Sequence, residues 1–326
     1  MSTVSPAVTD AGERVGLGSR LASAPWPELA APLGLVALII VFGLLDPTFV
    51  SGGNIEAMLQ ASAILVVLAV GQTFVVATAG IDLSMASVMT LGAIVLGLVY
   101  TGTDNIWLAM VAGVAAAGAV GLINGTIIAK GRITDFIVTL GALSAASGLA
   151  LIISDGKPIT VLNRAMLKLA SSGIGPLNWS VIIAAVVAVA AHFALFNSRF
   201  GLHVLATGGS EESARAVGVR TARVKIAVYT LSGVLAGVGA ILLVARVGAA
   251  EPASNTSFLL NSVAAVVLGG VSLFGGRATI IGPVMGALLL TALVNGLTLL
   301  GLSQFYQPLA VGIVVVLAAL LTRFQK

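Results

Sequence analysis

Long apolar runs, separated by short polar breaks, divide almost the whole chain. A helix needs about 20 apolar residues to cross the hydrocarbon of a bilayer. Ten runs approach or exceed this length, namely 30–45, 55–79, 85–100, 106–129, 136–153, 179–196, 226–245, 258–274, 280–300 and 308–321. The pattern predicts an all-α integral membrane protein with about ten transmembrane helices. Because several runs are short or rich in glycine, we expect some of these helices to be broken or re-entrant.

Composition supports a membrane location. Hydrophobic residues make up 58% of the chain and charged residues 9%, with a mean hydropathy of +1.12. A soluble domain carries about 25% charged residues. The chain has no cysteine, and His192 and His203 lie far apart, so we expect no disulfide and no metal site.

The distribution of basic residues predicts the orientation. With ten spans and a cytoplasmic N-terminus, twelve of the 16 Lys and Arg lie inside: Arg14, Arg20, Lys130, Arg132, Arg199, Arg215, Arg220, Arg223, Lys225, Arg277, Arg323 and Lys326. Four lie outside: Lys157, Arg164, Lys168 and Arg246. This excess satisfies the positive-inside rule and places both termini in the cytoplasm. The polar stretch 154–178, with three basic residues, is the one discordant segment.

The chain is predicted to have two parts. Residues 1–28 are polar and rich in Ser, Ala, Gly and Pro, so we expect a disordered cytoplasmic tail without a cleaved signal peptide. Residues 29–326 form a single transmembrane domain, and its longest charged loop is 197–225.

A short helix is predicted inside this loop. Ser210 is a suitable N-cap, and Glu211 and Glu212 fill the first turn, where the helix dipole favours negative charge. Gly218 suits the position that ends a helix. The result is a helix of about two turns, roughly 10 Å long. It is either a solvated connector or a helix that docks in a groove of a cytoplasmic partner.

Segment 208–218 resembles the cytoplasmic loop of ABC sugar-importer permeases of the ribose and xylose type, whose usual form is close to Gly-Gly-Asn-Glu-Glu-Ala-Ala-Arg-x-x-Gly. This chain departs from that form at Ser210 and Ser213. Other blocks resemble the family in the same order along the chain: 71–75, 80–84, 124–125, 136–141, 267–276 and 295–297. The resemblance covers roughly residues 48–322.

The resemblance implies a permease subunit in a bacterial cytoplasmic (inner) membrane that passes a monosaccharide. It also implies a second permease subunit in a homodimer, two cytoplasmic ATP-binding subunits and an extracytoplasmic sugar-binding protein. The ATPase-coupling residues would be Gly209, Ser210, Glu211, Glu212, Arg215 and Gly218. The chain has no Gly-x-x-x-x-Gly-Lys-Ser/Thr phosphate loop, so we expect no cofactor in this chain and ATP on the partner subunit. No nucleic-acid partner is expected.

Asp82 and Ser84 lie in the polar break before the third run. A carboxylate deep in a bilayer costs about 2.5–3.5 kcal/mol, which favours a place near the cytoplasmic interface. There Asp82 either caps the third helix through the backbone N–H of Ser84 or Met85, or lies on the translocation pathway.

Uncharged polar residues within or beside the apolar runs have two interpretations. In lipid each needs a partner, and hydrogen bonds between helices are the ordinary solution. Alternatively, some of them line a polar path for sugar hydroxyls. These residues are Gln72, Asn124, Asn261 and Asn295.

Three other functions compete with a sugar permease. An ABC permease for a branched-chain amino acid or a nucleoside would share most of these features. An ion-coupled secondary transporter would need charged groups at the membrane midplane, and the runs contain essentially none. A membrane enzyme would need a catalytic cluster, which the sequence does not suggest, so we expect a protein that is not an enzyme.

Overall fold

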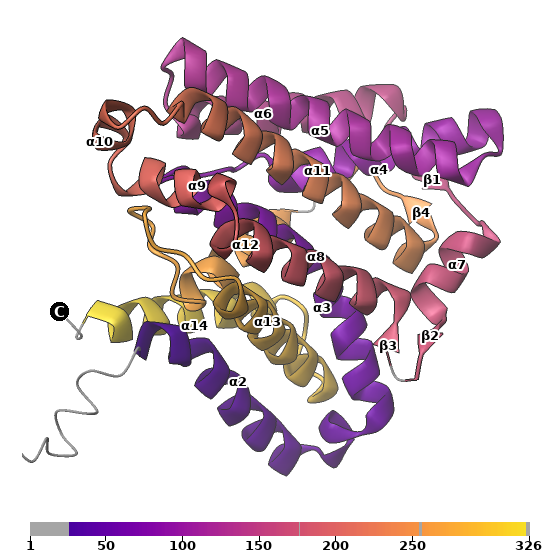
Figure 1. Cartoon of the computed structure of the whole chain (residues 1–326). Coiled ribbons are helices and arrows are strands. Elements are labelled where there is room, and N and C mark those ends of the chain that lie inside the picture. The colour runs from indigo at the N-terminus through magenta and orange to yellow at the C-terminus, as the bar shows by residue number, and fades with distance from the viewer. Residues whose placement is uncertain (1–25, 176, 254–255, 324–326) are drawn as a thin grey trace, which may run out of the picture.

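The computed structural model describes residues 26–175, 177–253 and 256–323. Helices dominate the described chain (Figure 1). Those within or beside the apolar runs are α2 (Trp26–Leu45), α3 (Gly52–Ala77), α4 (Met85–Thr103), α5 (Ile106–Gly131), α6 (Asp135–Ile153), α8 (Trp179–Phe196), α11 (Thr221–Val247), α12 (Thr256–Leu268), α13 (Ile281–Leu299) and α14 (Tyr306–Arg323). The shorter elements are η1 (Pro47–Val50), α7 (Arg164–Ser171), α9 (Arg199–Gly209), α10 (Glu211–Ala216), β1 (Ile159–Thr160), β2 (Gly173–Ile174), β3 (Leu177–Asn178) and β4 (Ala249–Ala250).

Each of the ten predicted runs contains a helix, and the all-α class is confirmed. Among the described residues, seven helices are long and apolar enough to cross a membrane: α3, α4, α5, α6, α8, α11 and α13. Helices α2, α12 and α14 contain shorter apolar stretches, so their complete crossing stays a prediction.

Several predicted boundaries were wrong. The loop predicted over 197–225 ends at Arg220, because α11 begins at Thr221. The run 258–274 is helical only to Leu268, because Gly270 has a φ of +76° and turns the chain out of the helix. Residues 26–28, assigned to the disordered tail, begin α2. The rest of that predicted tail, 1–25, lies outside the described residues.

The helices run between two ends of the molecule, which we name by the short helix at each (Figure 1). At the α10 end, the Gly276 amide donates to the carbonyl of Ala77, the last residue of α3, at 3.1 Å. At the α7 end, the Val161 amide donates to the Gly248 carbonyl, just after α11, at 2.8 Å. The start of α2 and the end of α14 both lie at the α10 end (Figure 1).

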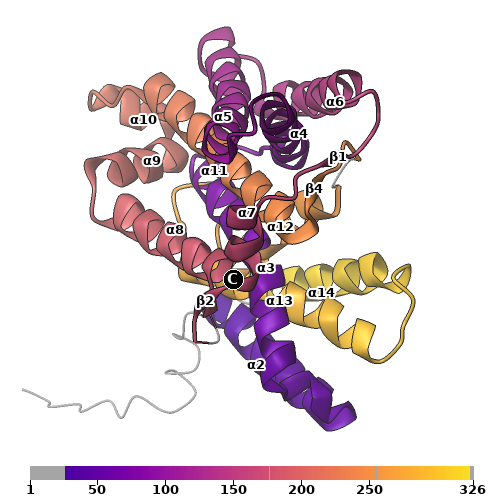
Figure 2. The same cartoon turned by 90° about the vertical axis from the view of Figure 1, so that its right-hand side faces the viewer.

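Helices α3, α4 and α11 form the buried centre, and most of the α3 side chains are inaccessible. Viewed from the α7 end, α5 and α6 lie on one side of this centre, and α2, α13 and α14 lie on the other (Figure 2). The outward faces of α5, α6 and α8 expose large apolar side chains, as in Ile152, Val186 and Phe193. Such faces suit contact with lipid.

Glycines let α5 and α11 pack backbone to backbone. A Cβ on Gly121 would lie 2.3 Å from the Tyr229 carbonyl oxygen, and one on Gly233 would lie 2.5 Å from the Ala117 carbonyl oxygen. Small residues at helix interfaces permit such an approach in membranes. Gly233, in the seventh apolar run, therefore has a packing role.

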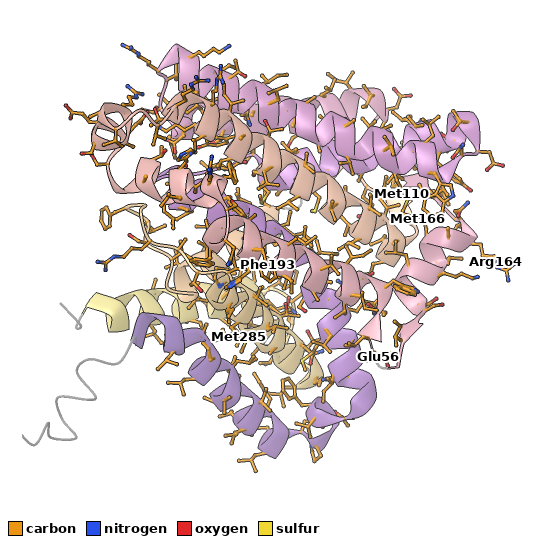
Figure 3. The ribbon with its side chains drawn as sticks, in the orientation of Figure 1. Glu56, Met110, Arg164, Met166, Phe193 and Met285 are labelled. Carbon is orange, nitrogen blue, oxygen red and sulfur yellow. The ribbon has the colours of Figure 1, made fainter. Side chains whose placement is uncertain are left out.

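The stretch 154–178, expected only to be polar, is ordered into α7 and two strand pairs at the α7 end. Strand β1 pairs antiparallel with β4, and β2 pairs antiparallel with β3. Met166 is buried on the inner side of α7, whereas Arg164 projects outward (Figure 3). The β1–β4 pair joins the segment before α7 to the segment after α11.

We predict that Gly121→Ala destabilises the protein by about 1–3 kcal/mol, the usual range for overpacking, because the new methyl group meets a helix backbone. The measurement is thermal unfolding of the detergent-solubilised protein. Gly148→Ala, on α6 with nothing within 4 Å of the added Cβ, is the control and should unfold at the same or a higher temperature. An equal effect of the two substitutions would contradict close packing of α5 on α11.

Candidate functional site

Helix α10 begins and ends where the sequence predicts. The Ser210 hydroxyl oxygen accepts a hydrogen bond from the Ser213 amide at 3.2 Å, which makes Ser210 the N-cap. Gly218 has a φ of +88° and ends the turn. Glu212 and Gly209 are exposed beside it. Helix α9, which packs beside α10, was not predicted.

Glu211 joins α10 to the first turns of α11. Its carboxylate accepts a hydrogen bond from Lys225 Nζ at 2.7 Å, another from the Thr221 hydroxyl at 3.2 Å, and pairs with Arg215 four residues later. Arg215 Nε also donates to the Thr221 hydroxyl at 2.8 Å. The two hydrogen bonds from Thr221 and Lys225 of α11 to the Glu211 carboxylate fix the position of α10 on α11.

Two opposing effects act on the pKa of the Glu211 carboxyl, and partial burial by itself would raise it. The hydrogen bond and charge of Lys225, with the charge of Arg215, outweigh that effect, so the pKa lies below its ordinary value. A lowered pKa means that these contacts contribute stability above the usual carboxyl range and lose it as pH falls through the folded-state pKa. The link between α10 and α11 is therefore complete at neutral pH.

The last turn of α9 touches the end of α3 through backbone alone. A Cβ on Gly208 would lie 1.9 Å from the Ala77 carbonyl oxygen, and Gly276 lies against Gly209. Gly275 and Gly276 both have positive φ, at +77° and +73°. The residues directly before α10 thus meet both the end of α3 and the turn after α12.

The chain between α3 and α4, residues 78–84, is the α3–α4 break. Asp82 within it is 3% exposed. Its Oδ1 accepts from the Ser84 amide at 2.9 Å and from the Ser84 hydroxyl at 2.6 Å, and its Oδ2 accepts from the Ser232 hydroxyl of α11 at 2.7 Å. Asn124 Nδ2 of α5 donates to the Ser84 hydroxyl at 3.0 Å. The structure confirms the predicted Asp82–Ser84 amide contact and adds bonds to two other helices.

A second carboxylate holds the same break. The Ile81 amide donates to Asp135 Oδ2 at the start of α6. The Thr139 hydroxyl lies 3.3 Å from the Ile81 carbonyl oxygen, and the buried Tyr229 hydroxyl lies 3.4 Å from it. The Tyr229 hydroxyl is also 3.5 Å from Asp135 Oδ2.

A polar cavity of about 320 Å³ connects Asp135 and Tyr229 with α10. The break, the end of α5, the start of α6 and the first turns of α11 form its walls. Its charged lining residues are Arg132, Asp135, Glu211, Arg215 and Lys225. Among the described residues, no group of His, Asp and Glu has the arrangement of a metal site.

The other predicted pathway residues do not line this cavity. Asn295 belongs to the α7 end, where its amide pairs reciprocally with that of Asn54 at 2.9 and 3.0 Å. Asn261 is half-buried on α12. Gln72 of α3 is fully buried, and neither polar atom of its amide has a partner in the described part of the chain. Asn54 itself lies in the first turn of α3, whose N-cap is Ser51.

Sequence reasoning missed Ser232, Asp135 and Tyr229. Asp135 carried a weak signal, since it is an acidic residue directly before an apolar run, where the dipole of a helix favours negative charge. Tyr229 lies four residues after Lys225, which places both on one helix face.

A family model described as the permease component of the branched-chain amino acid transport system matches residues 54–320. The ribose import permease protein of Bacillus subtilis strain 168 is 38% identical over 299 residues, 91% of this chain and 92% of that protein. The ribose import permease protein of Escherichia coli K12 is 37% identical over 308 residues, 93% of this chain and 96% of that protein.

The L-arabinose ABC transporter permease protein of Azospirillum brasilense is 35% identical over 294 residues, 89% of this chain and 86% of that protein. No solved structure matches the chain.

We predict that Asp82→Asn lowers the stability of the protein by about 1–3 kcal/mol, because the amide NH₂ cannot accept the bonds that the carboxylate oxygens accept. Thermal or denaturant unfolding in detergent measures this loss. Asp104→Asn is the matched control, because Asp104 is an exposed residue with a φ of +53° that asparagine adopts equally well. If Asp82→Asn lowered the free energy of unfolding no more than Asp104→Asn, the structural role of the buried cluster would be contradicted.

Proposed function

The chain belongs to the permease family whose model it matches over residues 54–320, and on that premise we propose that it is the transmembrane permease subunit of an ABC importer that passes a monosaccharide. It is a multi-pass protein of a bacterial inner membrane, as its relatives and its apolar helices indicate. The relatives are permeases, which agrees with a protein that has no catalytic activity of its own.

The cargo follows from the individual relatives. The family description names branched-chain amino acids, but relatives that align along almost their whole length are named for ribose and L-arabinose. A branched-chain amino acid or nucleoside as cargo is therefore not favoured. Among the described residues, aromatic rings contribute few groups to the break and its cavity, which suits passage of a sugar that another protein recognises.

The position of α10 is the observation that carries the proposal. It presents an acidic first turn at one end of the bundle and is fixed by Glu211 to α11. Its preceding residues Gly208 and Gly209 touch the end of α3 and the turn after α12. An ATPase that binds α10 can therefore act on the α3–α4 break through these contacts. We assign the coupling role to Gly209, Ser210, Glu211, Glu212, Arg215 and Gly218.

The partners follow from this assignment. Two cytoplasmic ATPase subunits would each bind α10 of one permease, and the permease would pair with a second copy of itself. An extracytoplasmic sugar-binding protein would deliver the cargo at the α7 end. ATP binds to the ATPase subunits, since this chain has no phosphate loop.

We infer that the α10 end faces the cytoplasm, with both termini there and ten crossings between the two ends. Eight basic residues occupy segments of the α10 end: Lys130, Arg132, Arg199, Arg215, Arg220, Arg223, Lys225 and Arg277. Four occupy segments of the α7 end: Lys157, Arg164, Lys168 and Arg246. The positive-inside rule then assigns the α10 end to the cytoplasm.

We assign Asp82, Ser84 and Asn124 to a gate on the cytoplasmic side of the translocation pathway. Gln72 belongs to the same route, because an unpaired buried amide costs about 1–3 kcal/mol and so calls for a functional reason. The assignment of Asn261 and Asn295 to the pathway stays a proposal. The bond between Asn295 and Asn54 gives Asn295 a structural role as well.

The orientation can be tested directly because the chain has no cysteine. Ala216→Cys on α10 and Ser172→Cys after α7 each introduce one exposed thiol. In right-side-out membrane vesicles, an impermeant maleimide should label the Ser172→Cys variant and leave the Ala216→Cys variant unlabelled until the membrane is opened. The reverse pattern would overturn the assignment of the α10 end to the cytoplasm.

We predict that Glu211→Lys with Glu212→Lys abolishes uptake, because two positive charges oppose the helix dipole and break the link to Lys225. D-ribose and L-arabinose are the first cargoes to test. The double variant should insert into the membrane at normal levels but lose the ATPase that co-purifies with the parent protein, as mass spectrometry of gently solubilised membranes would show.

Glu56→Lys is the control, because Glu56 is an exposed acidic residue near the start of α3, away from α10 (Figure 3). This variant should retain the ATPase. Normal uptake by the double variant would exclude α10 as the docking helix. If the parent protein were purified without an ATPase and its uptake were lost when the ion gradient was removed, the chain would be assigned as an ion-coupled transporter and not as an ABC permease.

A further inference from the structure

One face of α11 carries a row of polar side chains from the α10 end into the membrane domain. Thr221, Lys225, Tyr229 and Ser232 fall within an arc of ~80° on a helix with 3.6 residues per turn, over a length of about 16 Å. Three of the four are buried, with Thr221 2%, Tyr229 1% and Ser232 0% exposed. We call this row the α11 polar face.

The α11 polar face has α10 at one end and the α3–α4 break at the other. Thr221 and Lys225 bind Glu211 of α10 at 3.2 and 2.7 Å. One turn later Tyr229 contacts the break, and Ser232 donates to Asp82 at 2.7 Å. A single rigid helix therefore connects the docking helix with the buried carboxylate.

The Tyr229 hydroxyl is the loosest contact in this row. It has one proton and two acceptors, the Ile81 carbonyl oxygen at 3.4 Å and Asp135 Oδ2 at 3.5 Å. Both distances are long for an O–H···O bond, whose usual length is about 2.7–2.8 Å. The neighbouring bonds of Asp82 are short, so a displacement of α11 changes the Tyr229 contacts first.

Asp135 holds the break from the opposite side. It accepts the Ile81 amide bond and belongs to α6, which no bond of the described residues connects to α10. The polar cavity of about 320 Å³ lies between Asp135 and Glu211, so the side chains around it have room to move. The break is thus held between two helices. Helix α11 is bonded to α10 through Glu211, whereas α6 has no such bond among the described residues.

We propose that Tyr229 and Asp135 are positioning residues of transport, which tie the α3–α4 break to α11 and to α6 and let a displacement of α10 release it. The inference rests on the proposed function, in which ATPase subunits move α10. It adds to that function the contacts by which a displacement of α10 reaches the α3–α4 break. In the state described here the break is held, and movement of α11 withdraws the Tyr229 hydroxyl from Ile81 and Asp135.

The experiment uses the complex of the chain with its co-purified ATPase and reads the break directly. Ile81→Cys introduces one thiol at a position that is 38% exposed, and it keeps the backbone amide and carbonyl that make the contacts. The rate of maleimide labelling of this thiol is measured without nucleotide and with ATP and vanadate. In the Ile81→Cys protein, the parent for this series, we expect ATP to change the rate about fivefold or more, the lower range of allosteric coupling.

With Tyr229→Phe added, the ATP effect on labelling at position 81 should disappear while ATP hydrolysis and retention of the ATPase stay normal. With Asp135→Asn added, labelling should be faster without ATP, because a neutral amide oxygen accepts the Ile81 N–H bond more weakly than a carboxylate oxygen does. Tyr100→Phe is the matched control, since the Tyr100 hydroxyl makes a similar bond of 3.4 Å to the Leu162 carbonyl at the α7 end. It should leave the ATP effect unchanged.

The outcomes separate the two proposals. An unchanged ATP effect in both Tyr229→Phe and Asp135→Asn would overturn this inference and leave the importer assignment intact. A parent chain that co-purifies with no ATPase would overturn the proposed function, and this inference with it. A parent complex that hydrolyses ATP but shows no ATP effect at position 81 would overturn this inference alone. A purely structural role for Tyr229 would lower the unfolding temperature and leave the ATP effect in place.

Discussion

The hydrogen bonding of the backbone at the α3–α4 break constrains the rest of the structure. Peptide groups that leave a helix within a bilayer must find partners in the protein, because lipid offers none. The Ala77 carbonyl accepts the Gly276 amide, the Ile81 amide donates to Asp135, and the Ser84 amide donates to Asp82. These partners come from three separate parts of the chain, so the break is complete only when α6 and the turn after α12 are in place.

Glycine makes this arrangement sterically possible. The turn with Gly275 and Gly276 reaches Ala77 only because Gly208, which lies between them, has no side chain. The same principle brings α5 against α11, where Gly121 and Gly233 leave only backbone at the contact. Asn124 and Ser232 approach Ser84 and Asp82 from these two closely packed helices. These glycines thus support both the packing and the polar site.

The sequence predicted what depends on neighbours in the chain and missed what depends on distant segments. Hydropathy is a local property, so each of the ten runs contains a helix. The two ends of α10 likewise followed from Ser210 and Gly218. The contact of Asp82 with Ser84 spans two positions and was predicted. The contact of Asp82 with Ser232 spans 150 positions, and nothing local indicates it. Helices α7 and α9 are short and amphipathic, so they lack the apolar run by which the other helices were found.

Helix α11 extends this dependence from one end of the molecule to the other. It has 27 residues and a length of about 40 Å, which exceeds the hydrocarbon thickness of a bilayer. Its first turns bind Glu211, and the Gly248 carbonyl just after its last turn accepts the Val161 amide beside β1. Because one unbroken helix makes both contacts, a rotation imposed at α10 reaches the strands beside α7 without any change in the helix itself. The α3–α4 break contacts the first three turns of this helix, so in the proposed mechanism a displacement of α11 against Asp135 changes the break and the α7 end together.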